Sequence, residues 1–235
     1  MDEIVVRDLG LRPLPEVWAE MQAFTAERTA ATRDEVWFVE HPPVYTLGMR
    51  ADRSHLLAPG DIPVVQIDRG GQVTYHGPGQ LVMYALVDIG RLRIGVRELV
   101  MALEAAVVAL AASRGIEAAG RREAPGVYVG KRKLASIGLR VRRGCSYHGL
   151  ALNVDMDLGP FARINPCGVA GLEMTQLVAE GARTDVAECA NALAPLAAAS
   201  LGLAWDGRWS GPPGDPRAAA LQRATSTTPL SVRSW

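Results

Sequence analysis

The pattern of apolar and polar positions along the chain predicts three helices. Apolar side chains recur at helical spacing near residues 14 to 30 and again from 96 to 110. An alanine-rich stretch from about 185 to 201 predicts a third helix, with a kink or break at Pro195 because proline lacks the amide hydrogen that a helix interior needs. The apolar positions of the first two helices are Leu14, Val17, Trp18 and Met21, and then Val96, Leu99, Val100, Leu103, Val107 and Leu110.

Short apolar runs rich in β-branched and aromatic residues predict strands between these helices. Turns separate these runs more often than helical crossovers do, which favours an α+β fold over a doubly wound α/β sheet. The first run is broken where Pro42 and Pro43 follow Glu40. The predicted strands are EVWFVE (35–40), PVVQI (63–67), QLVMYALVDI (80–89), GVYVG (126–130), KLASIGLRV (133–141) and HGLALNV (148–154).

Length and composition predict one globular domain. The chain has 235 residues, 49% of them hydrophobic, which is enough for a single core over residues 1–210. Residues 211–235 are polar and contain proline, so we expect a loosely ordered tail there. No apolar run reaches the roughly 18 to 20 residues that span a bilayer, and the first residues lack the pattern of a signal peptide. We therefore expect a protein that does not act in a membrane and that is cytoplasmic, where a reducing environment fits its three widely spaced cysteines. We also expect a monomer.

Overall charge argues against binding to nucleic acid. Basic and acidic residues are equal in number, 25 of each, so no general basic surface is predicted. Between Arg114 and Arg143, however, nine basic residues stand against two acidic ones. This block would attract an acidic partner if the side chains gather on one surface. The alternative is that they are solvated residues at hairpin turns and strand edges.

The cysteines predict neither disulfide bonds nor a metal site. Cys145, Cys167 and Cys189 are widely spaced, and no CxxC motif is present. Cys145 and His148 form a C-x₂-H pair, but the further ligands that zinc requires are missing from the sequence around them.

A glycine-rich stretch, RGGQVTYHGPGQ at 69–80, raises the question of a phosphate-binding loop. The strand that follows it does not provide the helix N-terminus of a dinucleotide fingerprint. GVYVGKR at 126–132 has three residues between its glycines where a P-loop has four, and it lacks the Ser or Thr after the lysine. The glycines at 69–80 therefore let the backbone approach a ligand other than a nucleotide phosphate, or they form tight turns.

INPCG, residues 164–168, places Cys167 between proline and glycine in a bend of the chain. A cysteine thiolate is a strong nucleophile when a neighbouring base or cation lowers the pKa of the thiol. No histidine follows Cys167, which excludes the papain order of nucleophile and base. The chain has two lysines, Lys131 and Lys133, and either is a candidate base or a solvated residue of a hairpin.

Taken together, these motifs resemble the lipoyl(octanoyl) transferases. EHPPVYTLG, RGGQVTYHGPGQ, KLASIGLRV, HGLALNV and INPCG followed by GLEMTQL occur in the order of that family and cover roughly residues 5 to 205. The resemblance implies a fold like that of lipoate and biotin protein ligases, an α+β domain with a mixed, largely antiparallel sheet flanked by helices. It also implies transfer of an octanoyl or lipoyl group through a cysteine thioester, with no cofactor.

The resemblance further implies partners and site residues. The donor is octanoyl-acyl carrier protein, and the acceptors are lysines on the lipoyl domains of 2-oxoacid dehydrogenase complexes and on the glycine cleavage H protein. Cys167 matches the nucleophile of the family and Lys133 matches its base. The matching substrate-binding residues are Arg69, Gly70, Gly71, Gln72, Val73, Thr74, Tyr75, His76, Ser136, Ile137, Gly138, Gly149, Leu150 and Ala151.

Two other functions remain open on the sequence. An ATP-dependent lipoate or biotin ligase would share the fold without needing Cys167, and a non-catalytic acyl-binding module would form no covalent adduct. Within the transferase hypothesis, the glycines at 70, 71, 77 and 79 would thin a wall along which the acyl chain lies. Tyr75 and His76 would border the thioester, or His76 would be a hydrogen-bonded structural histidine.

Overall fold

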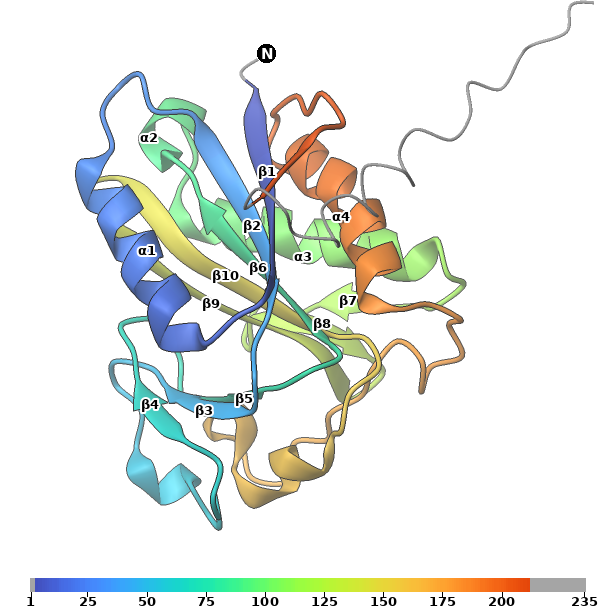
Figure 1. Ribbon diagram of the computed structural model, residues 1–235. Coiled ribbons are helices and arrows are strands. Elements are labelled where there is room, and N and C mark those ends of the chain that lie inside the picture. The colour runs from blue at the N-terminus through green and yellow to red at the C-terminus, as the bar shows by residue number, and fades with distance from the viewer. Residues whose placement is uncertain (1–2, 212–235) are drawn as a thin grey trace, which may run out of the picture.

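The computed structural model describes residues 3–211 and shows two sheets with helices packed against the larger one (Figure 1). The tail predicted at 211–235 lies outside the described residues, apart from Gly211. The larger sheet has the strand order β11-β1-β2-β6-β10-β9-β8-β7. Its strands are β1 (Ile4–Leu11), β2 (Asp34–Glu40), β6 (Gln80–Leu86), β7 (Ala119–Gly120), β8 (Gly126–Val129), β9 (Arg132–Arg142), β10 (Cys145–Asn153) and β11 (Trp209–Ser210).

The larger sheet is mixed and largely antiparallel, which confirms the predicted fold class. Strand β1 pairs in parallel with β2 and β11, whereas β2–β6, β6–β10, β10–β9, β9–β8 and β8–β7 are antiparallel. The smaller sheet has the order β4-β3-β5. It is made of β3 (Val44–Leu47), β4 (Val64–Gln66) and β5 (Val73–His76) and lies below the larger sheet in Figure 1.

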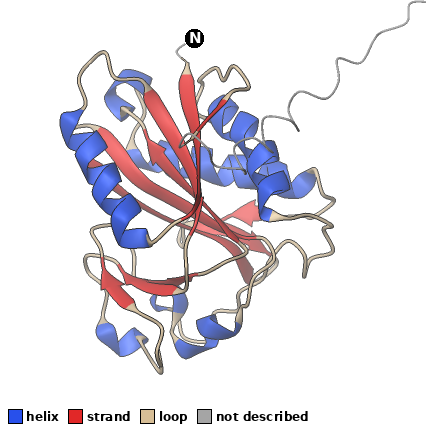
Figure 2. Cartoon of the chain, viewed as in Figure 1, coloured by secondary structure: helices blue, strands red, loops and turns tan. Residues whose placement is uncertain are grey.

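Helices cover both faces of the larger sheet (Figure 2). One face packs against α1 through a cluster that includes Val17 and Met21 of the helix and Trp37 and Tyr84 of the sheet. The other face packs against α3 and α4 in the largest apolar core of the protein. The helices are α1 (Leu14–Glu27), α2 (Ile89–Leu92), α3 (Val96–Ala112) and α4 (Val186–Ser200), and short 3₁₀ turns occur at Arg53–His55, Gly159–Arg163 and Pro166–Gly168. None of the helices in the described part is both long and apolar enough to cross a bilayer.

The structure corrects several details of the predicted elements. Helix α4 continues through Pro195, so the predicted break is wrong. Leu193, Ala194 and Ala197 are buried in the main core on both sides of the proline, and this packing stabilises the helix against the lost backbone hydrogen bond. The strand predicted at 80–89 ends at Leu86, and α2 begins at Ile89. Strands β1, β3, β5, β7 and β11 were not predicted.

Candidate active site

Cys167 lies in a strained turn that presents its side chain at the surface of a cavity. Its backbone has φ 57° and ψ 17°, and the next residue, Gly168, has φ 75°. Hydrogen bonds from Gly168 N to Asn165 O, at 2.9 Å, and from Val169 N to Pro166 O, at 3.1 Å, hold the turn. A left-handed conformation costs a residue other than glycine about 1–3 kcal/mol, and such strain concentrates at functional sites. The strained turn therefore makes Cys167 a candidate functional residue.

Lys133 points at the sulfur of Cys167 from strand β9. Its amine donates to Cys167 Sγ at 3.1 Å and to the carbonyl of Pro125 at 3.0 Å. The side chain is only 2% exposed, and its Nζ lies 5.2 Å from the centre of the Tyr128 ring. The two residues that the sequence proposed as nucleophile and base are thus in contact, although 34 positions separate them.

A β-bulge and a glycine make room for this lysine. The register between β8 and β9 shifts so that Tyr128 pairs with Lys133 while Val127 pairs with Ala135. The extra residue, Leu134, rotates the strand locally, as bulges near active sites commonly do. On the neighbouring strand β8, Gly126 has φ 137°, and a β-carbon there would lie 2.6 Å from Lys133 Cε and 3.1 Å from Nζ. Only glycine leaves space for the buried amine at this position.

A cavity of about 510 Å³ extends from Cys167 and Lys133 over the larger sheet. This volume falls within the roughly 300–1,000 Å³ that is usual for small-molecule sites. Two cross-strand pairs with small side chains line it, Ser136 with Ala151 and Gly138 with Gly149. Further lining residues are mostly apolar and come from several elements: Leu14, Ile67, Val82, Tyr84, Val96, Val100, Ile137, Leu139, Leu150, Val169 and Leu172. The cavity suits an apolar chain that begins at the Cys167 sulfur.

The segment 69–76 forms another wall of this cavity, with one exception. Arg69, Gly70, Gly71, Gln72, Val73, Thr74 and His76 line it. Tyr75 points the other way, with its ring centre 5.4 Å from that of Tyr45 and 5.5 Å from that of Phe161. Successive side chains of β5 alternate between its two faces, so Val73 and Tyr75 share the face that packs in the cluster with Tyr45 and Phe161, while Thr74 and His76 face the other way. Val73 also touches the edge of the cavity, whereas Tyr75 does not. The structure therefore places Tyr75 in the small apolar cluster under the loop and not beside the thiol.

His76 is a buried, neutral histidine. Its Nδ1 donates to Gln80 Oε1 at 2.7 Å, and its Nε2 faces the hydroxyl of Thr46 at 3.4 Å. Burial, aided by the neighbouring His41, lowers the pKa of His76 to about 3. Because both ring nitrogens have partners and the ring does not protonate near neutral pH, the geometry favours the structural alternative for His76.

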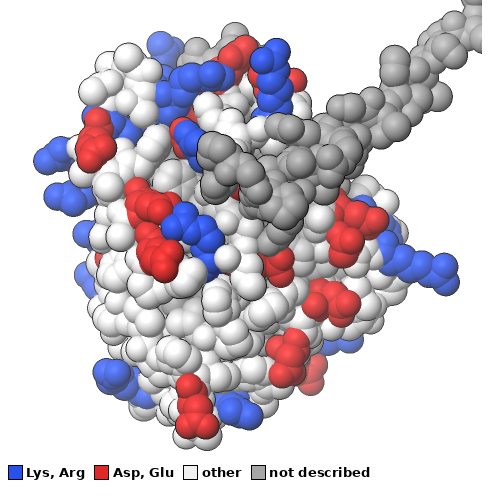
Figure 3. All heavy atoms as spheres, in the orientation of Figure 1, with Lys and Arg blue, Asp and Glu red and all other residues white. Residues whose placement is uncertain are grey.

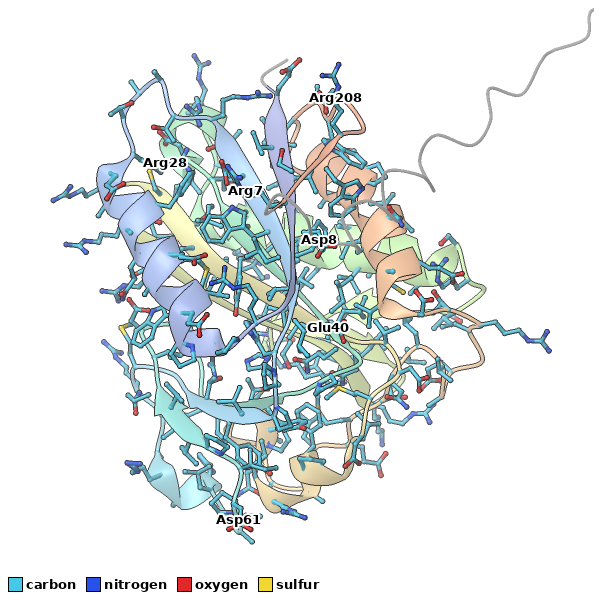
Figure 4. The ribbon with its side chains drawn as sticks, in the orientation of Figure 1. Arg7, Asp8, Arg28, Glu40, Asp61 and Arg208 are labelled. Carbon is cyan, nitrogen blue, oxygen red and sulfur yellow. The ribbon has the colours of Figure 1, made fainter. Side chains whose placement is uncertain are left out.

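The four glycines of the loop have two different roles. Gly70 and Gly71 line the cavity, as the acyl-wall hypothesis requires. A β-carbon on Gly77 would instead collide with the Tyr75 ring, and one on Gly79, where φ is 84°, would collide with the backbone of Asp155. Glu40, at the end of β2 (Figure 4), also accepts a hydrogen bond from Gly79 N at 2.8 Å. Gly77 and Gly79 therefore serve the turn before β6, and the hypothesis that they border the acyl chain is wrong.

Arg69 is a buried guanidinium that supports the loop. It donates to its neighbour's carbonyl, Gly70 O, at 2.9 Å and to the carbonyl and hydroxyl of Thr46, each at 2.8 Å. Burial lowers the pKa of Arg69 to about 10, while the nearby Cys167 thiolate acts in the opposite direction. Arg69 thus places a positive charge beside the cavity without a carboxylate partner among the described residues.

Asp68 is a residue of this region that the sequence analysis missed. Its carboxylate accepts hydrogen bonds from Trp18 Nε1 at 2.7 Å, Gln22 Nε2 at 3.2 Å, His148 Nε2 at 2.8 Å and the hydroxyl of Tyr147. The only sequence signal was its position directly before the glycine-rich stretch. His148 turns to Asp68 and Cys145 Sγ donates to Arg143 O, so the C-x₂-H pair does not converge on one point.

The basic block between Arg114 and Arg143 does not form one patch. Lys131 and Arg132 lie at the β8–β9 turn, and Arg142 and Arg143 lie at the β9–β10 turn. Ten positions along an antiparallel strand separate these turns by roughly 30 Å. Lys and Arg side chains are interspersed with Asp and Glu over the face shown in Figure 3. The block is thus divided between the two ends of β9, and the docking of an acidic partner on it stays a prediction. The turn beside Lys133 is the part of the block near the thiol.

Comparison with known proteins identifies relatives of the whole domain. The family described as lipoyl protein ligase A/B catalytic domain matches residues 14–195. An octanoyltransferase of Marinobacter nauticus is 60% identical over 177 residues, covering 75% of this chain and 84% of the relative. An octanoyltransferase of Aeromonas hydrophila is 57% identical over 208 residues, covering 85% of this chain and 89% of the relative.

Solved structures share the fold at low sequence identity. A bipartite lipoate protein ligase of Thermoplasma acidophilum, described with its E2 lipoyl domain, has a TM-score of 0.71 at 15% identity and covers 95% of this chain and 92% of its own. A lipoate-protein ligase A bound with ATP has a TM-score of 0.64 at 14% identity and covers 95% of this chain and 93% of its own. These two similarities concern the architecture of the domain.

Proposed function

The chain belongs to the family of lipoyl protein ligase A/B catalytic domains, and we propose that it is an octanoyltransferase of protein lipoylation. Its relatives with that name are about 60% identical over most of the chain. The proposed donor is the octanoyl thioester of acyl carrier protein. The proposed acceptor is a lysine of a lipoyl domain, as on 2-oxoacid dehydrogenase complexes or the glycine cleavage H protein.

The first half-reaction transfers the acyl group to the enzyme. The neutral amine of Lys133 accepts the proton of the Cys167 thiol across the 3.1 Å contact. The thiolate attacks the carbonyl carbon of the donor thioester, a new C–S bond forms, and the bond to the carrier's sulfur breaks. The departing thiolate of the carrier protein accepts this proton from Lys133, which leaves a neutral lysine beside an S-octanoyl cysteine. Because one thioester replaces another, this step needs no nucleotide.

The second half-reaction uses the same pair in reverse order. The neutral amine of the acceptor lysine attacks the S-octanoyl carbonyl, a C–N bond forms, and the bond to Cys167 Sγ breaks. Lys133 accepts the proton that the attacking nitrogen loses and returns it to the Cys167 sulfur. An amide is more stable than a thioester, so the sequence of two steps runs downhill and restores the starting enzyme.

The observation that carries this proposal is the buried Lys133 amine in contact with Cys167 at the mouth of an apolar cavity. A buried lysine needs a reason, because burial disfavours its charged form. Among the described residues, the hydrogen-bond partners of this amine are the Pro125 carbonyl oxygen and the Cys167 sulfur, so the one side chain in position to exchange a proton with it is Cys167.

Intact-mass spectrometry of the protein after incubation with octanoyl-acyl carrier protein tests the proposal. We expect a hydroxylamine-labile octanoyl adduct on the wild type, none on Cys167→Ser, and formation slowed about 10²- to 10⁴-fold in Lys133→Ala, since a general base contributes that much. Lys131→Ala, two positions away in the exposed turn, is the matched control and should acylate normally.

The two alternatives predict different outcomes of the same measurement. Lipoyl-domain modification that requires ATP and survives Cys167→Ala would identify a ligase. A wild type that binds octanoyl thioesters and never acquires the adduct would identify a non-catalytic acyl-binding module.

A further inference from the structure

The carboxylate of Asp68 connects three separate parts of the chain. Helix α1 contributes Trp18 Nε1 and Gln22 Nε2, and strand β10 contributes the Tyr147 hydroxyl and His148 Nε2, at distances of 2.5 to 3.2 Å. Asp68 itself leads directly into the cavity wall that begins at Arg69. Four donors on one carboxylate fill the acceptor positions that its two oxygens offer.

The hydrogen bonds to Asp68 fix the positions of residues that line the buried end of the acyl cavity. His148 lines the cavity while it donates to Asp68. Leu14, one turn before Trp18 on α1, and Ile67, directly before Asp68, line it as well. The three side chains are 3%, 3% and 4% exposed, in the order His148, Leu14 and Ile67, whereas Val169 next to the Cys167 turn is 49% exposed. The part of the cavity at Asp68 is therefore buried, whereas the parts beside Cys167 and at Val96, a lining residue that is 47% exposed, are open.

The Asp68 network lies away from the reacting sulfur. His148 immediately precedes Gly149, which pairs with Gly138 on β9. Gly138 is five positions beyond Lys133 on β9, and one of the intervening residues is the bulged Leu134. The two residues are therefore separated by roughly 15 Å along the strand. A disturbance of Asp68 that passes through β10 and β9 should therefore reach the far end of a bound acyl chain before it reaches the Lys133–Cys167 contact. Arg69, which follows Asp68 and lies near Cys167, is held by its own hydrogen bonds to Gly70 and Thr46.

Asp68 is ionised in the folded protein. Partial burial opposes the charge, but the hydrogen bonds from His148, Tyr147, Trp18 and Gln22 outweigh it and hold the pKa of Asp68 well below its usual range. An asparagine at this position would keep the shape and present an NH₂ group to donors that need an acceptor. Asp68→Asn is thus a sharp perturbation of the network with little change in volume.

We propose that Asp68 is a positioning residue that fixes the closed end of the cavity and so limits the length of the acyl chain that the enzyme accepts. The proposal rests on the proposed function, because it concerns the acyl group that Cys167 receives. It assigns to one carboxylate the placement of Ile67, His148 and, through Trp18, Leu14.

Acyl-enzyme formation with hexanoyl, octanoyl and decanoyl thioesters tests it. In Asp68→Asn we expect KM for the octanoyl donor to rise about tenfold, the loss that follows from one disrupted charged hydrogen bond. The decanoyl-to-octanoyl ratio of kcat/KM should rise severalfold, because the end wall is no longer fixed, while kcat at saturating octanoyl donor stays within about threefold of the wild type. Tyr147→Phe, which removes one donor, should shift the ratio in the same direction by less.

Asp34→Asn is the matched control. Asp34 also accepts several hydrogen bonds, from Arg28 (labelled in Figure 4) at 2.5 Å, Arg91 at 2.6 Å and the Asp88 amide at 2.8 Å, and it does not line the cavity. It should lower stability and leave the chain-length ratio unchanged. An unchanged ratio in folded Asp68→Asn, an equal shift in Asp34→Asn, or a loss of kcat alone would overturn the proposal.

A binding measurement separates this proposal from the proposed function. Calorimetric titration of octanoate and decanoate into Cys167→Ser, with and without Asp68→Asn, gives the chain-length ratio without any transfer. If the wild type forms no acyl-enzyme, the proposed function fails. If the titration ratio does not change with Asp68→Asn, the end-wall proposal fails on its own.

Discussion

Replacement of Gly126 by alanine should disconnect Lys133 from Cys167 without touching either residue. A β-carbon at this position would lie 2.6 Å from Lys133 Cε and 2.5 Å from the Ala135 carbonyl oxygen. The Ala135 carbonyl is part of the β9 backbone, so its contact persists as strain in the variant, whereas the lysine side chain ends in a cavity and can move away. The amine is therefore the group that moves.

The free energies involved are large enough to force this movement. A φ of 137° in a residue with a β-carbon costs about 1–3 kcal/mol, and the contacts add about 1–3 kcal/mol of overpacking. A typical domain has only about 5–15 kcal/mol of stability, so the variant should be less stable than the wild type, and the lysine side chain should leave the contact that it can avoid. Loss of a general base slows proton transfer about 10²- to 10⁴-fold, and we expect the rate of acyl-enzyme formation in Gly126→Ala to fall in that range.

Rapid-quench intact-mass spectrometry of octanoyl transfer to the enzyme measures this rate, and urea unfolding measures the stability of the same variant. Gly130→Ala is the control, since Gly130 lies in the β8–β9 turn with φ 55° and a β-carbon there meets nothing within 4 Å. It carries a left-handed strain of roughly 1–2 kcal/mol but should acylate at the normal rate. A folded Gly126→Ala enzyme that acylates as fast as the wild type would refute the reasoning about Lys133.

Two further predictions concern acid stability and partner docking. Burial lowers the pKa of His41 to about 4 and of His76 to about 3, below the unfolded value of 6.5. Below pH 6.5 the unfolded chain therefore binds more protons than the folded protein. As the pH decreases from 6.5, the free energy of unfolding should fall by up to about 1.4 kcal/mol per pH unit for each histidine. Urea unfolding midpoints measured between pH 7 and 5 check this, and constant midpoints would contradict it. Arg122 lies between the cavity-lining residues Arg121 and Glu123, so Arg122→Glu should slow octanoyl transfer from acyl carrier protein more than Arg142→Glu with Arg143→Glu, a pair at the β9–β10 turn. Neither change should affect a small octanoyl thioester, and equal losses with both donors would argue against docking.

Much of the fold was predictable because apolar periodicity is a local property of the sequence. The runs at 35–40, 126–130 and 133–141 became β2, β8 and β9 with ends shifted by one residue or less. Strand β5 was missed because the glycines on either side of it made the whole stretch from 69 to 80 read as a loop. Pro195 was given too much weight because the packing of α4 against the core is not visible in its own sequence.

Site residues could be predicted when their type and their sequence neighbours indicate the chemistry. They could not be predicted when their role depends on contacts between distant parts of the chain. The bend at Cys167 could be inferred from its proline and glycine neighbours. The bulge that orients Lys133 could not be inferred, because it depends on a register shift between two strands. Asp68 remained hidden for the same reason, since its partner His148 is 80 positions away. Contacts at such separations appear only once the chain has folded.

The three cysteines differ in access, and this gives the protein a built-in reporter. Cys145 and Cys189 are buried and burial raises the pKa of both thiols, whereas Cys167 is partly exposed. A fluorescent maleimide applied briefly near neutral pH should therefore label the wild type at one defined atom, with no background mutations. The fraction of protein that is protected from this label would then measure the fraction of the enzyme that carries an acyl group on Cys167 during turnover.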